Sequence, residues 1–207
     1  MKNRRTLVLS SSYLPLSLFP LYTIPAEDAI TRYLTDSCSV VVWYDDEIGT
    51  VRDLGLKWPS VIANFNGHSF KKDIRLKKES LFYRDHCVCQ YCGGELTISS
   101  MTYDHVKPRA SGGTHDWSNV VASCKECNNL KGDSTDYKKW KPRQAPWTPD
   151  FFEMIKIRSK FPIVVDDESW SQFLPNWAGE VIVRGKKEMD EKTLPKYLLE
   201  ELIPVPA

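Results

Sequence analysis

Two short cysteine motifs decide how the middle of this chain folds: CQYCGG at residues 89–94 and CKEC at residues 124–127. In each motif, two thiolates three positions apart can reach the same Zn²⁺ ion. The glycine pair that ends the first motif allows the tight turn that aims backbone N–H groups at the sulfur atoms. The four thiolates form a closed set of the kind typical of a structural zinc site: Cys89, Cys92, Cys124 and Cys127.

Neighbouring residues leave alternatives for this ligand set. His86 and Cys87 stand just before the first motif, and either is an alternative ligand to one of its cysteines. A single Cys-x-x-Cys motif can also be a thiol–disulfide redox centre, here Cys89 with Cys92, but that reading leaves the second motif unexplained. Cys38 has no partner pattern and is expected to be a small buried hydrophobic residue.

The segment between the two motifs predicts a strand, a polar loop, a second strand and a helix. The stretch LTI occurs at 96–98 and MTYDHV begins at Met101, a glycine pair follows at 112–113, and WSNVVA covers 117–122. Ser123 with Glu126 has the spacing of a capping box, so the helix is expected to begin close to Cys124 and to end at Gly132. The overall prediction is an α+β fold around this segment.

With its order and spacing, this segment resembles the HNH endonuclease family. The matching string is Cys89-x-x-Cys92, then YDHV-x-PR-x-x-GG at 103–113, WSNVV at 117–121, and C-x-x-CN-x-x-KGD at 124–133. The resemblance covers about 50 of the 207 residues. It implies a ββα-metal nuclease core with a four-cysteine structural zinc, and hydrolysis of DNA phosphodiester bonds to 5′-phosphate and 3′-hydroxyl ends.

The resemblance also assigns roles to four residues. His105 is the expected general base, because a neutral imidazole can take a proton from water at physiological pH. Asp104 and the side-chain oxygen of Asn128 are expected to hold one divalent cation, and two hard oxygen ligands suit Mg²⁺ or Mn²⁺ better than Zn²⁺. Asn119 is expected to bond to the backbone and to fix the loop that presents His105.

Asp104 and His105 pose a geometric problem, because neighbouring residues on a strand point to opposite faces. Both can serve one site only where the strand ends or bends, and Pro108 makes an early end plausible. His115 is expected to be a surface loop residue, with a position near the metal or DNA as the alternative.

The charge pattern indicates where nucleic acid would bind. The net charge of the chain is only +1, but residues 71–143 hold 14 basic and 9 acidic residues. Basic residues near the expected catalytic pair and in the run YKKWKPR at 137–143 are the candidate phosphate contacts. They are Lys107, Arg109, Lys131, Lys138, Lys139 and Lys141. Lys131 has an alternative reading as a helix C-terminal charge that interacts with the helix dipole.

The remaining predictions concern organisation and setting. We expect a mixed α/β region at 1–80, a nuclease domain at 81–141 and a C-terminal extension at 142–207. Strands are predicted at 5–9 and 39–44, and helices at 25–34 and 149–160. No apolar stretch is long enough to cross a membrane, and paired cysteines favour an intracellular, cytoplasmic protein of a bacterium or phage. The expected partner is double-stranded DNA, with a homodimer or a partner protein left open. The alternative function is a zinc-stabilised nucleic-acid-binding module without catalysis.

Overall fold

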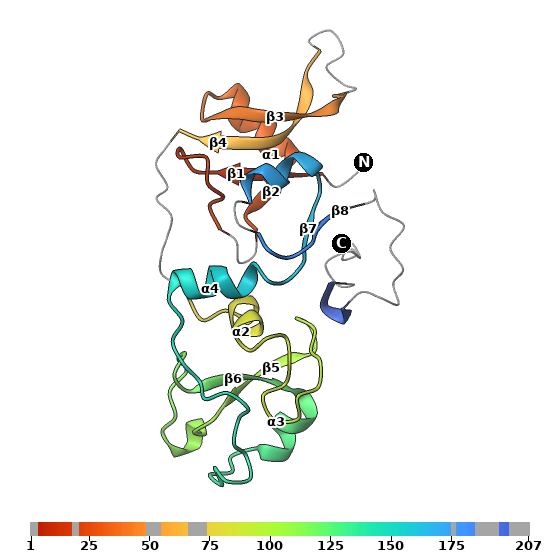
Figure 1. Cartoon of the computed structure of the whole chain (residues 1–207). Coiled ribbons are helices and arrows are strands. Elements are labelled where there is room, and N and C mark those ends of the chain that lie inside the picture. The colour runs from red at the N-terminus through yellow and green to blue at the C-terminus, as the bar shows by residue number, and fades with distance from the viewer. Residues whose placement is uncertain are drawn as a thin grey trace. The chain divides into compact units, whose positions relative to one another are not determined.

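The computed structural model describes residues 4–17, 21–48, 55–65, 74–174, 177–184 and 195–198. The chain divides into two compact units (Figure 1). The first unit consists of Met1–Lys71 and Pro162–Glu188, and the second of Lys72–Phe161 and Met189–Ala207. No helix among the described residues combines the length and the apolar character that a membrane crossing requires.

The first unit is built on a four-stranded sheet. Its elements are β1 (Arg5–Leu9), β2 (Thr23–Pro25), α1 (Ala26–Leu34), β3 (Cys38–Glu47), β4 (Lys57–Asn64), β7 (Ile163–Val165), η3 (Glu168–Phe173) and β8 (Val181–Val183). The sheet order is β2-β1-β4-β3, with β1 parallel to β4 and the other pairs antiparallel. The predicted strands at 5–9 and 39–44 and the helix at 25–34 are confirmed.

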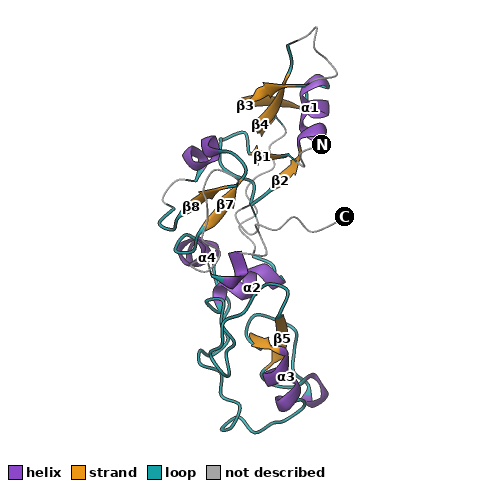
Figure 2. Ribbon diagram, turned by 90° about the vertical axis from the view of Figure 1, so that its right-hand side faces the viewer, coloured by secondary structure: helices purple, strands orange, loops and turns teal. Residues whose placement is uncertain are grey.

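Alternation along β1 sends its side chains to two different cores. Leu7 and Leu9 pack with β4, β7 and η3 on one face, and Val8 packs with α1 on the other. Figure 2 shows α1 and the β7–β8 pair on opposite sides of the sheet. The indole N–H of Trp170 in η3 donates to Ser60 Oγ at 2.9 Å, which fixes η3 against β4. Cys38 is buried in the α1 core, as expected of a small hydrophobic residue.

The second unit contains both cysteine motifs. Its elements are α2 (Lys78–Arg84), β5 (Met101–His105), η2 (Arg109–Ser111), β6 (Val120–Cys124), α3 (Lys125–Lys131) and α4 (Phe151–Arg158). Strands β5 and β6 form an antiparallel pair in which Met101 faces Cys124 and His105 faces Val120. Helix α3 follows β6 without a loop and ends at Gly132 as predicted, and α4 lies within the predicted helix at 149–160.

The predicted capping box of α3 is wrong. The N-cap is Cys124, whose Sγ accepts the backbone N–H of Cys127 at 3.4 Å. The hydroxyl of Ser123 instead donates to the carbonyl of Cys124. A cysteine sulfur therefore serves as the helix cap here, and the same sulfur belongs to the cysteine cluster described below.

A buried ion pair holds β6 in place. The Arg84 guanidinium is fully buried, binds the Asp85 carboxylate at 2.7 Å, and donates to the carbonyls of Val120 and Trp117 at 2.6 and 2.8 Å. The Asp85 carboxylate accepts the backbone N–H of Ala122 at 2.6 Å. These bonds satisfy a charge pair that would otherwise be costly to bury, and they fix the strand that leads into the candidate site.

Candidate functional site

Four cysteine sulfur atoms come together at the start of α3. They belong to the two predicted motifs, and all lie within 4.8 Å of one another: Cys89, Cys92, Cys124 and Cys127. Four thiolates around one Zn²⁺ at about 2.3 Å would lie about 3.8 Å apart in an ideal tetrahedron, so a small contraction completes the site. His86 and Cys87, the alternative ligands, are not part of this cluster.

Backbone hydrogen bonds to the sulfur atoms stabilise the thiolate form that binds a cation. The backbone N–H of Gly94 donates to Cys92 Sγ, and that of Cys127 donates to Cys124 Sγ. Burial alone would raise the pKa of Cys89, but backbone bonds from the motifs and a side-chain bond from Ser123 outweigh it and lower that pKa to about 6. Burial and the neighbouring thiols raise the pKa of Cys127. A positive ion is the natural counter-charge for such a sulfur cluster.

Asp104 lies next to this cluster and is almost fully buried, with 3% of its surface exposed. Its carboxylate accepts a hydrogen bond from the Tyr91 hydroxyl, and Tyr91 lies between the two cysteines of the first motif. Burial and the bond to Asp104 raise the pKa of Tyr91, so the hydroxyl keeps its proton and donates. The Lys131 ammonium, also buried, contacts the Asp104 carboxylate at 3.1 Å.

His105 follows Asp104 at the last position of β5, where the strand was expected to end. Its carbonyl accepts a hydrogen bond from Lys131 Nζ at 2.7 Å, and its Nε2 lies 3.1 Å from Nδ1 of His115. Burial is the largest cause that lowers the pKa of His105 below 6.5, followed by His115 and Arg109, while Asp104 opposes them. The imidazole is therefore neutral at physiological pH, the state that a proton acceptor requires.

Asn119 binds the loop after His105 with both ends of its amide. Its Oδ1 accepts the backbone N–H of Lys107 at 2.8 Å, and its Nδ2 donates to the carbonyls of Lys107 and Thr114 at 3.1 and 2.8 Å. A Cβ atom on Gly113 would lie 1.8 Å from the Lys107 carbonyl oxygen, so only glycine fits at this crossing. Asn119 thus makes the backbone contacts that the sequence suggested.

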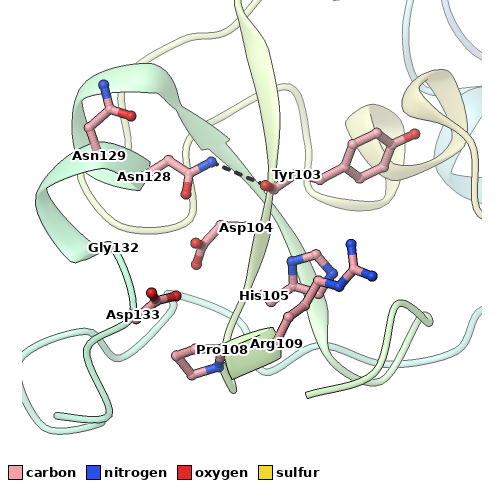
Figure 3. A pocket seen from close by; sticks show the side chains of 9 residues that line it. All are labelled: Tyr103, Asp104, His105, Pro108, Arg109, Asn128, Asn129, Gly132 and Asp133. Atoms are coloured by element: carbon pink, nitrogen blue, oxygen red, sulfur yellow. Dashed lines mark hydrogen bonds between the residues drawn. The ribbon is translucent and has the colours of Figure 1, made fainter. Parts of the chain in front are cut away.

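Asn128 lies in α3, one turn after Cys124. Its Nδ2 donates to Thr102 Oγ1 at 3.0 Å and to the Tyr103 carbonyl at 3.1 Å, and these two acceptors identify the nitrogen end of the amide. The Oδ1 atom is turned toward Asp104 (Figure 3).

A pocket of about 530 Å³ joins these groups. Its lining residues are Tyr103, Asp104, His105, Pro108, Arg109, Asn128, Asn129, Gly132 and Asp133. Figure 3 shows the carboxylate of Asp104 between Asn128 and His105. The expected base and both expected cation ligands therefore share one pocket.

The geometry and the comparisons with known proteins agree on the family of this segment. The family model described as HNH endonuclease matches residues 89–134. The chain carries an HNH endonuclease domain. The match runs from the first cysteine of the cluster to the end of the pocket.

Two curated relatives match part of this chain. Both are described as CRISPR-associated endonuclease Cas9. The protein of Corynebacterium diphtheriae is 43% identical over 58 residues, which is 28% of this chain and 5% of that protein. The protein of Actinomyces naeslundii is 27% identical over 104 residues, which is 50% of this chain and 8% of that protein. The similarity thus concerns a small part of either relative.

The predicted basic residues of the HNH domain and its C-terminal flank fall into two groups. Five are exposed: Lys107, Arg109, Lys138, Lys139 and Lys141. Arg109 lines the pocket. The segment that carries the last three lies against the first cysteine motif, because Arg143 N–H donates to the Gln90 carbonyl at 2.7 Å and Trp140 contacts Tyr91 edge to face. Lys131 differs, since its ammonium is buried against Asp104.

Sequence reasoning missed several residues of the HNH site. Tyr91 sits inside the first motif, but its residue type does not indicate a contact with Asp104. His115 was expected on a surface loop, with a position near the metal or DNA as the alternative, and it is exposed with its Nδ1 3.1 Å from Nε2 of His105. Asp133 belongs to the matching string but had no predicted role, and it lines the pocket with Tyr103 and Asn129. For Asp133 a signal was available, because its carboxylate ends the matching string.

The donor atoms of the pocket suit a hard divalent cation. Asp104 and Asn128 present one carboxylate and one amide oxygen toward the same space, and no cysteine is among the residues that line the pocket. A cation there would share Asp104 with Lys131, because the ammonium already contacts the carboxylate.

Proposed function

We propose that the chain is a metal-dependent endonuclease that hydrolyses phosphodiester bonds of double-stranded DNA. The observation that carries the proposal is the convergence of His105, Asp104 and Asn128 on one pocket inside the HNH domain. The four-cysteine cluster would hold a structural Zn²⁺, and the pocket a catalytic Mg²⁺ or Mn²⁺.

In the proposed reaction, His105 accepts a proton from a water molecule as the water oxygen attacks phosphorus. The P–O3′ bond breaks, the 3′ oxygen leaves and takes a proton from solvent, and the products are a 5′-phosphate and a 3′-hydroxyl. The neutral state of His105, favoured by its lowered pKa, suits this step. A divalent cation bound by Asp104 and Asn128 would stabilise the negative charge that develops on the phosphate and the leaving oxygen.

The other residues of the site position these groups. Tyr91 and Lys131 both bind the Asp104 carboxylate, and Lys131 also binds the carbonyl of His105. Asn119 fixes the backbone at Lys107, two residues after the base. Such support keeps reacting groups within a fraction of an ångström of the productive geometry.

The proposed DNA contacts are the five exposed residues of the predicted basic set. Arg109 lines the pocket, and Lys107 lies in the chain between the lining residues His105 and Pro108, so both would contact the phosphates next to the scissile bond. Lys138, Lys139 and Lys141 lie on the segment held against the first motif, and would contact phosphates farther away. For Lys131, phosphate contact stays a prediction that requires the ion pair with Asp104 to open. With one site per chain, a monomer would nick DNA and a dimer could cut both strands.

Cleavage of supercoiled plasmid tests the proposal. The purified full chain, loaded with zinc, is incubated with Mg²⁺, Mn²⁺ or EDTA, and His105→Ala is compared with His68→Ala, which changes a histidine outside the HNH domain. We expect metal-dependent nicked or linear product, no product with His105→Ala, and parental activity with His68→Ala. DNA binding measured by gel shift should be nearly unchanged in both variants.

Two results would contradict the proposal in different ways. Parental cleavage by His105→Ala would remove His105 as the base. DNA binding by folded, zinc-loaded protein with no cleavage under any metal would favour the alternative, a zinc-stabilised binding module without catalysis. The position of the Lys131 ammonium on Asp104 is the observation that favours this alternative, because it competes with a cation there.

A further inference from the structure

His115 approaches the expected base directly. Its Nδ1 lies 3.1 Å from Nε2 of His105, and the two ring centroids are 5.1 Å apart at an angle of 47°. Its ring also meets that of Tyr103 edge to face, with centroids 5.4 Å apart. These contacts place a nitrogen atom of His115 in hydrogen-bond geometry with one specific nitrogen of His105.

The loop that carries His115 is held on both sides of it. On one side, Gly113 crosses so close to Lys107 that a Cβ atom would collide with the carbonyl, and its N–H donates to Pro108 at 3.0 Å. On the other side, Asp116 accepts the backbone N–H of Ser118 at 2.9 Å and closes a tight turn.

Asn119 ties the two sides together, since it donates to the carbonyl of Thr114, the residue before His115. The side chain of His115 is exposed, so its position depends on this fixed backbone and on its contacts with His105 and Tyr103. The fixed backbone of this loop therefore holds the His115 ring next to His105.

The bond between the two rings has consequences for the proton on His105. A neutral imidazole carries one N–H and one bare nitrogen, and which nitrogen is bare depends on the partner of the other. If Nδ1 of His115 accepts, His105 must carry its proton on Nε2 and leave Nδ1 bare. A bare nitrogen away from His115 is what a base needs to take a proton from water.

We propose that His115 is a positioning residue for His105: it accepts the Nε2–H of His105 and keeps the Nδ1 of His105 free to receive the proton of water. The inference rests on the proposed function for its catalytic consequence. When His105 takes the proton, both of its nitrogens carry hydrogen, and the Nε2–H bond to His115 persists through the step. The proton later passes from Nδ1 of His105 to solvent.

Two substitutions separate the hydrogen bond from the shape of the ring. His115→Phe keeps a planar ring but removes the acceptor. His115→Asn is the matched control, because its Oδ1 is bonded to Cγ as Nδ1 is in histidine, so it retains an acceptor close to the same place. The exposure of His115 makes both changes compatible with folding, which zinc content and thermal melting of the full chain verify.

The first readout is the ¹⁵N spectrum of His105 in the full, zinc-loaded chain at about pH 8, where an ordinary imidazole is neutral. The chain has four histidines, so His105→Gln assigns the signals. We expect a protonated Nε2 and a bare Nδ1 in the parent and in His115→Asn, and a mixture of both tautomers in His115→Phe. A parent with the proton on Nδ1, or a His115→Phe variant with unchanged tautomers, would overturn the inference.

The second readout is single-turnover cleavage of plasmid. We expect His115→Phe to cleave about three- to tenfold more slowly, the effect of one exposed hydrogen bond, with DNA affinity unchanged. His115→Asn should recover most of the rate. If His115→Phe and His115→Asn cleave at the same rate, His115 does not position the base through its hydrogen bond. If the parent does not cleave at all, the proposed function fails, while the ¹⁵N spectrum still decides whether His115 sets the tautomer.

Discussion

Asn119 offers the sharpest test of how the HNH site is held together. Its single side chain makes three hydrogen bonds, two to Lys107 and one to Thr114. Asn119→Ala removes all three. Asn119→Asp keeps the acceptor for the Lys107 N–H, but turns a carboxylate oxygen toward two carbonyl groups in place of the amide donor.

The expected cost follows from the number and exposure of these bonds. A hydrogen bond contributes about 1 kcal/mol net to folding, and the three bonds here are partly open to water, so Asn119→Ala should lower the free energy of unfolding by about 2 kcal/mol. For a unit of roughly 100 residues that corresponds to a fall in Tm of about 8 °C. Asn119→Asp should cost at least as much, because like partial charges then face each other.

Amide hydrogen exchange distinguishes the two variants locally. We expect the Lys107 amide to lose protection in Asn119→Ala and to keep it in Asn119→Asp, while Val106, whose N–H binds the Asn119 backbone carbonyl, stays protected in both. Plasmid cleavage should fall more than tenfold in each, because the segment after His105 loosens. An Asn119→Ala variant with a fully protected Lys107 amide and parental melting would refute this account.

Two further predictions concern the supports on either side of this site. Cys127→Ser should bind well below one zinc ion per chain and unfold at a much lower temperature, because structural zinc affinity contributes directly to folding free energy. The control Cys38→Ala should keep its zinc. Metal analysis measures the zinc content and calorimetry the melting temperature. In Gly113→Ala the new Cβ would lie 1.8 Å from the Lys107 carbonyl oxygen, so the two atoms must separate by more than 1 Å, to about 3 Å. We expect this variant to lose nearly all cleavage activity but to retain zinc. Parental activity would contradict the close crossing of Gly113 and Lys107.

Much of the site could be predicted from the sequence, because the cysteine pairs and the residues that end strands and helices are chemically distinctive. Paired cysteines three apart can serve a single ion, and the structure gathers their four sulfur atoms. Strand β5 ends at His105 as the alternation argument required, and α3 ends at Gly132. These predictions rest on local geometry, which a sequence carries directly.

Long-range contacts between ordinary residues could not be predicted in the same way. No local pattern marks Arg84 and Asp85 as structural, yet they are buried and bind the backbone of β6, about 35 residues later. Likewise, no local signal indicates that Trp170 packs on β4 and bonds to Ser60. The capping error at Ser123 arose because a cysteine sulfur competes with a hydroxyl as the helix cap, a choice that depends on the fold around the cluster.

One hydrogen bond connects the cysteine cluster with the pocket that holds the proposed cation ligands. Tyr91 lies between Cys89 and Cys92, so its backbone is fixed by the fold of the first motif, and its hydroxyl binds the Asp104 carboxylate in the pocket. Asp104 is buried, and a buried carboxylate is stable only with such donors and a counter-charge, here Lys131. A zinc ion bound by the cysteines would therefore act on catalysis without touching the substrate: by fixing the motif, it fixes the carboxylate that the proposed catalytic cation needs.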